Sequence, residues 1–226
     1  MAIYEDATTG KIWLGTDGGG VVVMEGERFT EHYTTENGLA GNIVFKISKD
    51  ADGAFWICTG TGVSRLYNGK FDNFTKLSGM GTDSVFQMIE DRAKNAWFVS
   101  NAGVSSVKKQ DMIDMVSGKS THIVPKFYTR FDGLKTIGAT STALSMIDSR
   151  GQLWFTLIDG FAVCDPNKLQ LNSIKPSTNI EYITIDDTLV HPSKEPIVLP
   201  AGTKRIRIKY AGLSFVSSEL MQFQYK

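Results

Sequence analysis

Carboxylate pairs are the first feature of this sequence that could do chemistry. Two carboxylates at a suitable separation act as acid and base in glycosidases. Each pair in this chain lies within a predicted turn, where solvated turn residues are the better interpretation. The sequence therefore predicts no catalytic carboxylate. The pairs are Asp50 with Asp52, Glu90 with Asp91, and Asp186 with Asp187.

Histidines and glycine-rich stretches offer metal, nucleophilic or phosphate chemistry. His32, His122 and His191 are scattered and have no ligand spacing, so the sequence predicts neither a zinc site nor a catalytic triad. The glycines of residues 16–20 and 60–62 are not followed by the GK[ST] signature or by a predicted helix, as a phosphate loop requires. We interpret them as hairpin glycines, and no metal or cofactor is predicted.

Charge and composition narrow the class of protein further. The 226 residues include 24 basic and 24 acidic side chains, so no net field attracts nucleic acid or an anionic membrane. No run approaches the roughly 20 apolar residues of a membrane span, and residues 1–11 lack the pattern of a signal peptide. Cys58 and Cys164 lie far apart in apolar runs, which favours small buried side chains over a disulfide or redox pair.

Four tryptophans define an internal repeat. Each has an acidic residue six or seven positions before it, an apolar run around it, and a glycine six or seven positions after it. The first two intervals, 43 and 41 residues, match one four-stranded propeller blade. The third interval, 57 residues, is lengthened by an insertion at residues 110–126. The tryptophans are Trp13, Trp56, Trp97 and Trp154.

The second repeat predicts a complete blade. We expect strands at residues 43–49, 55–59, 62–67 and 70–75, with Asn68-Gly69 as a type I′ turn. Because the tryptophans recur, we interpret them as core between blades. The repeated acidic residues are expected to cap turns. These residues are Asp6, Asp50, Asp91 and Asp148.

Short Gly-Leu motifs recur between blades. Asn37-Gly38-Leu39 and Asp132-Gly133-Leu134 each follow a predicted outer strand, and Ser78-Gly79-Met80 resembles them. The glycine suits a backbone position with positive φ, and the leucine is expected to fill the seam between blades.

Beyond residue 166 the tryptophan frame stops. Residues 179–187 and 204–210 alternate between apolar and polar side chains, and prolines separate them, which predicts a second all-β unit of sandwich type. The predicted fold is all-β: a partial β-propeller of about four four-stranded blades (residues 1–174), then an incomplete immunoglobulin-like β-sandwich (residues 175–226).

Two features together resemble one family. The Asp-x-x-Gly-x-hydrophobic-Trp-hydrophobic-Gly-Thr frame with its Asn/Asp-Gly-Leu triplets resembles the two-component regulator propeller repeat. Residues 208–215, with Glu219-Leu220 and residues 223–225, resemble the Tyr-rich sandwich domain that follows the propellers of Bacteroidetes hybrid two-component histidine kinases. Cys58 and Val99 depart from the glycine of the frame, and Lys94-Asn95 replaces its glycine turn.

The resemblance implies a non-catalytic, periplasmic, ligand-sensing fragment of an inner-membrane sensor histidine kinase. It further implies an oligosaccharide ligand and a homodimer formed through the sandwich or the propeller, without direct nucleic-acid binding. Family members carry two seven-bladed propellers, so the chain is expected to be an excerpt. No ligand-binding residue is assigned, although contact is expected in the irregular residues 110–126 and 135–142, because loops on rigid scaffolds usually carry binding.

Two alternatives remain open from the residues alone: a secreted propeller lyase or other carbohydrate-active propeller enzyme, and an interaction scaffold without a ligand. Any open arc of blades exposes strand edges and apolar faces. We therefore expect self-association through the free face of the first blade, near residues 3–23.

Overall fold

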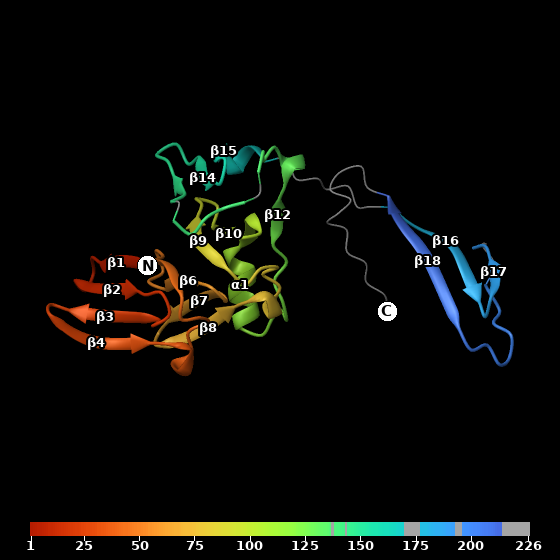
Figure 1. The fold of residues 1–226 in the computed structure, drawn as a ribbon, viewed down its shortest axis with the longest axis horizontal. Helices are drawn as coiled ribbons and strands as arrows, with labels where there is room; N and C mark the ends of the chain where they lie inside the picture. Colours follow the sequence, from red (N-terminus) through yellow and green to blue (C-terminus); the bar gives the residue numbers. More distant parts are fainter. Residues whose placement is uncertain (137, 143, 170–176, 193–195, 214–226) are drawn as a thin grey trace. The chain divides into compact units, whose positions relative to one another are not determined.

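The computed structural model describes residues 1–136, 138–142, 144–169, 177–192 and 196–213. The chain forms two compact units, residues 1–169 and residues 170–226 (Figure 1). The predicted boundary between residues 174 and 175 lies outside the described residues.

The first unit begins with two four-stranded antiparallel sheets. Within each sheet the strands pair in chain order, as in a propeller blade. The first sheet contains β1 (Ala2–Asp6), β2 (Lys11–Gly15), β3 (Val21–Glu25) and β4 (Arg28–Tyr33). The second contains β5 (Val44–Lys49), β6 (Phe55–Thr59), β7 (Gly62–Tyr67) and β8 (Lys70–Phe74).

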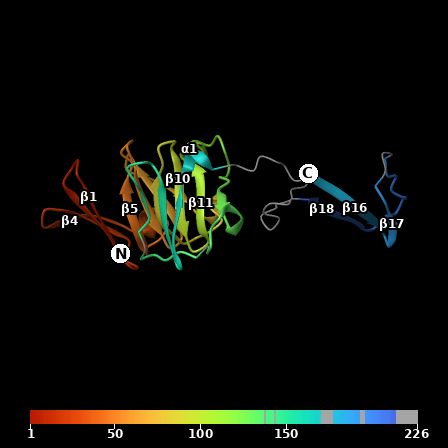
Figure 2. The ribbon, with the colours of Figure 1, turned by 90° about the horizontal axis from the view of Figure 1, so that it is seen from above.

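The same pattern continues in the third and fourth sheets. Among the described residues the fourth sheet has three strands. Figures 1 and 2 show the sheets following one another with the first at one end. The third sheet contains β9 (Val85–Glu90), β10 (Asn95–Ser100), β11 (Gly103–Lys108) and β12 (Lys126–Tyr128). The fourth contains β13 (Met146–Ile147), β14 (Leu153–Leu157) and β15 (Gly160–Cys164).

The core of the first unit lies in the seams between consecutive sheets. Three buried clusters fill these seams, and each contains one tryptophan: Trp13 in the first, Trp56 in the second and Trp97 in the third. All three are at most 5% exposed, which confirms that they are core between blades. Trp154 of the fourth sheet is half-buried and stacks on Phe161.

Short 3-10 turns join one sheet to the next and end in glycine where predicted. These are η1 (Thr35–Asn37), η2 (Lys76–Ser78) and η3 (Arg130–Asp132), and a fourth, η4 (Pro166–Lys168), follows β15. Gly38, Gly79 and Gly133 all have positive φ, and Leu39 and Met80 are buried in the seams. The predicted role of the Gly-Leu motifs is confirmed at these positions.

The insertion is more regular than its sequence suggests. We expected residues 110–126 to be irregular, but α1 (Lys109–Val116) forms two helical turns there. Met112 and Ile123 are buried in the cluster between the second and third sheets. The expectation is wrong for the helical part, because apolar side chains at helical spacing pack into this seam.

The second unit contains, among its described residues, one three-stranded antiparallel sheet in the order β17-β16-β18. Its strands are β16 (Ser177–Ile185), β17 (Thr188–Val190) and β18 (Ile206–Leu213). The all-β class and the partial propeller are confirmed, and this sheet is the described part of the predicted sandwich. The tail motif at Glu219-Leu220 and residues 223–225 lies outside the described residues.

No helix in the described part of the chain is long and apolar enough to cross a membrane.

Candidate functional site

The repeated aspartates hold the turn between the first two strands of each sheet. Asp50 accepts hydrogen bonds from the backbone N–H groups of Asp52 and Ala54 and, at 2.8 Å, from the indole Nε1–H of Trp56. Asp91 and Asp148 make the equivalent bonds in the third and fourth sheets. Their predicted turn-capping role is confirmed.

The first sheet departs from this pattern. Asp6 caps its turn through Thr8 and Thr9, but Trp13 lies seven residues later, one more than in the other sheets. The Nε1–H of Trp13 is buried and has no hydrogen-bond partner among the described residues. Lys49 of the second sheet binds Asp6 instead, at 2.9 Å.

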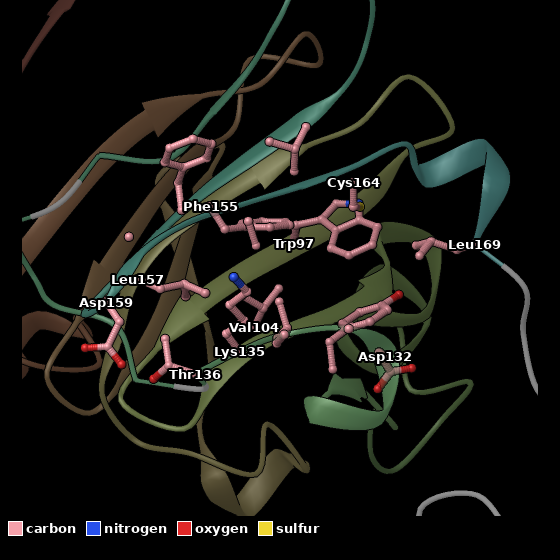
Figure 3. A pocket seen from close by; sticks show the side chains of 17 residues that line it. Trp97, Val104, Asp132, Lys135, Thr136, Phe155, Leu157, Asp159, Cys164 and Leu169 are labelled. Atoms are coloured by element: carbon pink, nitrogen blue, oxygen red, sulfur yellow. The ribbon is translucent and has the colours of Figure 1, made fainter.

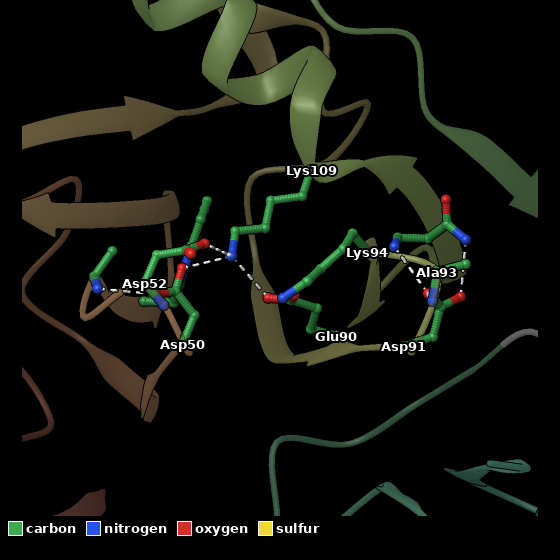
Figure 4. A network of polar contacts seen from close by, with 10 residues as sticks. Asp50, Asp52, Glu90, Asp91, Ala93, Lys94 and Lys109 are labelled. Carbon is green, nitrogen blue, oxygen red and sulfur yellow. Dashed lines mark hydrogen bonds and ion pairs between the residues drawn. The ribbon is translucent and has the colours of Figure 1, made fainter.

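A buried lysine joins three of the predicted carboxylates. The ammonium of Lys109 lies 2.7 Å from Asp50, 3.0 Å from Asp52 and 2.9 Å from Glu90. Figure 4 shows it between the turn of the second sheet and that of the third. Lys94 also pairs with Glu90, at 2.7 Å. The network therefore links two consecutive sheets.

The electrostatics of this network argue against acid catalysis. Burial disfavours the charged form of Asp50, but hydrogen bonds from Lys109 and Trp56 outweigh it and hold the pKa of Asp50 below its usual value. Burial likewise opposes the charge of Lys109, yet the carboxylates raise its pKa. A glycosidase acid needs a raised carboxyl pKa, so Asp50 is unsuited to donate a proton.

The other predicted residues are not brought together. Nε2 of His32 lies 2.7 Å from the carbonyl oxygen of Gly19, while His122 and His191 are exposed in other parts of the chain. Asp186 accepts hydrogen bonds from the backbone N–H groups of Lys204 and Arg205. No three His, Cys, Asp or Glu side chains of residues 1–213, within the described ranges, are grouped as metal ligands.

Both cysteines are free. Cys58 is fully buried, and burial raises the pKa of its thiol to about 12. Cys164 is half-buried, and burial together with nearby carboxylates raises its pKa to about 11. Neither thiol is ionised near neutral pH, which fits a packing role.

A cavity of about 470 Å³ lies between the third and fourth sheets (Figure 3). Its inner wall is aromatic and aliphatic, whereas its rim carries charged and hydroxyl side chains. Such a combination suits a small organic ligand, since apolar walls supply contact and a few polar groups fix orientation. The inner wall includes Trp97, Val104, Tyr128, Phe155 and Leu157, and the rim includes Asp132, Lys135, Thr136 and Asp159.

Two rim charges have no partner among the described residues. Lys135 and Asp159 make no hydrogen bond or ion pair there and are exposed, and Figure 3 shows them with Thr136 on one side of the cavity. Asp132, in contrast, accepts a hydrogen bond from the backbone N–H of Thr129 at 2.9 Å. Lys135 and Asp159 are therefore the rim groups available to a ligand.

The third seam differs from the first beside its tryptophan. At the first seam Phe71 of β8, an outer strand, packs edge-on against Tyr33. At the third seam Trp97 and Tyr128 line the cavity. The segment 135–142, where ligand contact was expected, contributes Lys135 and Thr136 to the cavity lining. Asp159, which the sequence analysis did not name, lies between β14 and β15.

Solved structures share this fold, although no protein-family model and no curated protein sequence matches the chain. The extracellular domain of the hybrid two-component system BT3049 from B. thetaiotaomicron is 19% identical, with a TM-score of 0.65 over 93% of this chain. That of the hybrid two-component system BT4673 from the same organism is 18% identical, with a TM-score of 0.63 over 89%.

A second BT4673 structure, described as a one component system, is 17% identical, with a TM-score of 0.60 over 90% of this chain. The chain spans 29%, 30% and 31% of the three solved domains, which is under a third of their length. At identities of 17% to 19%, the similarity to these solved domains establishes the fold of the chain. The chain has the fold of part of these extracellular two-component system domains, as the tryptophan frame predicted.

Proposed function

We propose that this chain is part of the extracytoplasmic sensing region of a hybrid two-component histidine kinase. It binds a ligand without transforming it, and its location in the cell is the periplasm. The observation that supports this proposal is the likeness of 93% of the chain to an extracellular domain of such a system.

We further propose that the ligand is an oligosaccharide, bound at the cavity between the third and fourth sheets. Sugars present apolar C–H faces together with hydroxyl groups, and the cavity offers Trp97 and Tyr128 on its wall with Lys135 and Asp159 on its rim. Aromatic rings supply contact area to the apolar faces, and the two rim charges are free to hydrogen-bond hydroxyls.

After the ligand binds, the signal must be passed to the rest of the parent kinase. A ligand shifts a conformational equilibrium only by its difference in affinity between two states. We propose that binding biases the arrangement of two copies in the parent kinase, since rigid-body rearrangement of domains is a common form of switching.

Calorimetric titration of the purified chain with a panel of oligosaccharides tests the ligand. For a saccharide that binds, Lys135→Ala and Asp159→Ala should each raise the Kd about tenfold, since a charge-assisted hydrogen bond contributes about 1.5 kcal/mol or more. Lys119→Ala is the matched control, because Lys119 is an exposed lysine shortly after the end of α1 and is not among the residues that line the cavity. Equal effects of all three variants would overturn the cavity assignment.

Two further measurements separate the proposed sensor from the alternatives. Chromatography of the bound saccharide after prolonged incubation should show an unchanged chain length, whereas new reducing or unsaturated ends would indicate an enzyme. In the parent gene, Lys135→Ala should weaken the transcriptional response to the same saccharide, and Lys119→Ala should not. An unaltered response in Lys135→Ala would contradict sensing at this site.

A further inference from the structure

One backbone hydrogen bond recurs where the turn after the second strand of a sheet meets the loop that enters the same sheet. In the second sheet, the N–H of Gly60 donates to the carbonyl oxygen of Ile43 at 3.0 Å. In the fourth sheet, the N–H of Ile158 donates to the carbonyl oxygen of Gly138 at 2.9 Å. We call this contact the turn-loop bond. The third sheet has it from Asn101 to Ser84, at 3.4 Å.

The acceptor of the turn-loop bond has the same place in each loop. Ile43 is four residues after Leu39, the last residue of its Gly-Leu motif, and Gly138 is four residues after Leu134. The loop that enters the fourth sheet therefore keeps the spacing of the other loops as far as Gly138. The same spacing separates Ser84 from Met80.

The fourth sheet departs from the others directly after this acceptor. Ten positions separate Gly138 from the turn-capping Asp148. Only seven separate the acceptor of the second sheet from its capping Asp50, so the fourth sheet has three additional residues here. Among the described residues β13 pairs with β14 at two positions, whereas β5 pairs with β6 as far as Thr59, next to the turn. The turn at Ile158 therefore depends more on its turn-loop bond.

The residues that follow the bonded positions are both charged in the fourth sheet. Lys135 has the place of Ala40 after the Gly-Leu motif, and Asp159 has the place of Thr61 in the turn. These two places are neighbours in the second sheet, where the hydroxyl of Thr61 donates to the carbonyl oxygen of Ala40. Small or neutral residues thus suffice for packing the sheets, and the two charges point to another role. The third sheet has Gly81 and Ala102 at these places.

We propose that Gly138 and Ile158 are positioning residues of the ligand cavity. Their turn-loop bond fixes the loop that carries Lys135 against the turn that carries Asp159, and it thereby sets the separation of the two rim charges. Groups that are already in place bind a ligand without the cost of ordering them first. This inference rests on the proposed binding of an oligosaccharide at the cavity.

The loop is the fixed partner of this bond. Leu134 and Ala139, on either side of Gly138, both pack in the apolar cluster between the third and fourth sheets. Loss of the turn-loop bond should therefore displace the turn with Asp159 and leave Lys135 in place.

Ile158→Pro tests the bond, because proline has no N–H and suits the first central position of a turn. In calorimetric titration of the purified chain with a saccharide that binds the wild type, this variant should raise the Kd about tenfold. Ile158→Ala keeps the N–H and should bind like the wild type. Gly60→Pro is the matched control, because it removes the equivalent bond in the second sheet, away from the cavity, and should leave the Kd unchanged.

A double-mutant cycle separates positioning from general damage to the fold. If Ile158→Pro acts by displacing Asp159, its addition to Asp159→Ala should raise the Kd by no more than about twofold. A further tenfold loss in that background would show an effect that does not pass through Asp159, and the proposal would be wrong. Tryptophan emission shows whether each variant has folded.

Amide hydrogen exchange of the wild type supplies a second test that needs no variant. A saccharide that contacts both rim charges should hold the turn-loop bond closed and slow the exchange of the Ile158 N–H about threefold or more. An unchanged exchange rate at saturation would contradict the proposal. Equal Kd values for the wild type and a folded Ile158→Pro would overturn this inference alone, whereas a wild type that binds no saccharide would overturn the ligand proposal and this inference with it.

Discussion

The ammonium of Lys109 lies 2.7 Å from the carboxylate of Asp50, and both side chains are only 4% exposed. Lys109 is the first residue of α1, directly after β11 of the third sheet, whereas Asp50 lies in the turn between β5 and β6 of the second sheet. Similar cationic links occur at the other seams. Lys49 binds Asp6 across the first seam, and Arg92 donates to the carbonyl oxygen of Ser149 across the third. Charges thus fix the turns of consecutive sheets together, while the apolar clusters fill the seams beneath them.

Replacement of Lys109 should therefore destabilise the first unit strongly. Lys109→Met keeps most of the side-chain volume but leaves Asp50 buried without its cation, and leaves Glu90 with Lys94 as its remaining partner. The expected loss is about 3 kcal/mol of unfolding free energy, as for a broken buried ion pair. Denaturant titration followed by tryptophan fluorescence measures it, because all four tryptophans lie in residues 1–169.

Lys119→Met is the control for this measurement. Lys119 is 71% exposed and pairs with Asp114 at 3.4 Å, so its loss should cost no more than about 0.5 kcal/mol. Similar losses in the two variants would show that the Lys109 network contributes nothing beyond a surface ion pair.

The tryptophan repeat makes a second prediction. Trp97 donates to Asp91 at 2.9 Å, whereas the Nε1–H of Trp13 is buried without a partner in the described structure. Trp97→Phe removes a hydrogen bond to a charged acceptor and Trp13→Phe does not. Denaturant titration should therefore find Trp97→Phe more destabilising than Trp13→Phe by about 1.5 kcal/mol. A larger loss in Trp13→Phe would contradict the assigned hydrogen bonding.

Much of the fold was predictable because its determinants recur. One tryptophan frame repeats four times, so strand positions could be carried from one repeat to another. The predicted strands 55–59 and 62–67 coincide with β6 and β7. Asn68 and Gly69 both have positive φ, as a type I′ turn requires. Such a turn can be predicted because its backbone requirement falls on two neighbouring residues, and the types of those two residues show it directly in the sequence.

Features that occur once left no such signature. Lys109 pairs with Asp52 57 residues away, and nothing near Lys109 in the sequence indicates that contact. The cavity lining combines Lys135 and Asp159, which lie far apart in the sequence. Single long-range contacts and gaps between sheets are set by tertiary packing, which a repeat pattern does not encode.

Asp6 makes a prediction about pH. Burial opposes its ionisation, but hydrogen bonds from Lys49, Thr9 and Thr8 outweigh it and lower its pKa to about 2. An unfolded aspartate has a pKa of about 3.9, so the stabilisation is fully present above pH 4 and is lost as the pH falls toward 2. The stability difference between wild type and Asp6→Asn should therefore shrink over this window in denaturant titrations. A difference that stays constant with pH would rule out this linkage.

The hairpin glycines make the last prediction. Gly62 has φ +141°, and a Cβ added there would lie 2.4 Å from the backbone oxygen of Phe74 on the neighbouring strand. Gly69 also has positive φ, but a Cβ there would meet no atom within 4 Å. Gly69→Ala should therefore cost only backbone strain, about 1 kcal/mol. Gly62→Ala must also push β8 away from β7, and denaturant titration should show a loss at least twice as large. Equal losses would mean that the strands separate without cost, contrary to the close packing of this sheet.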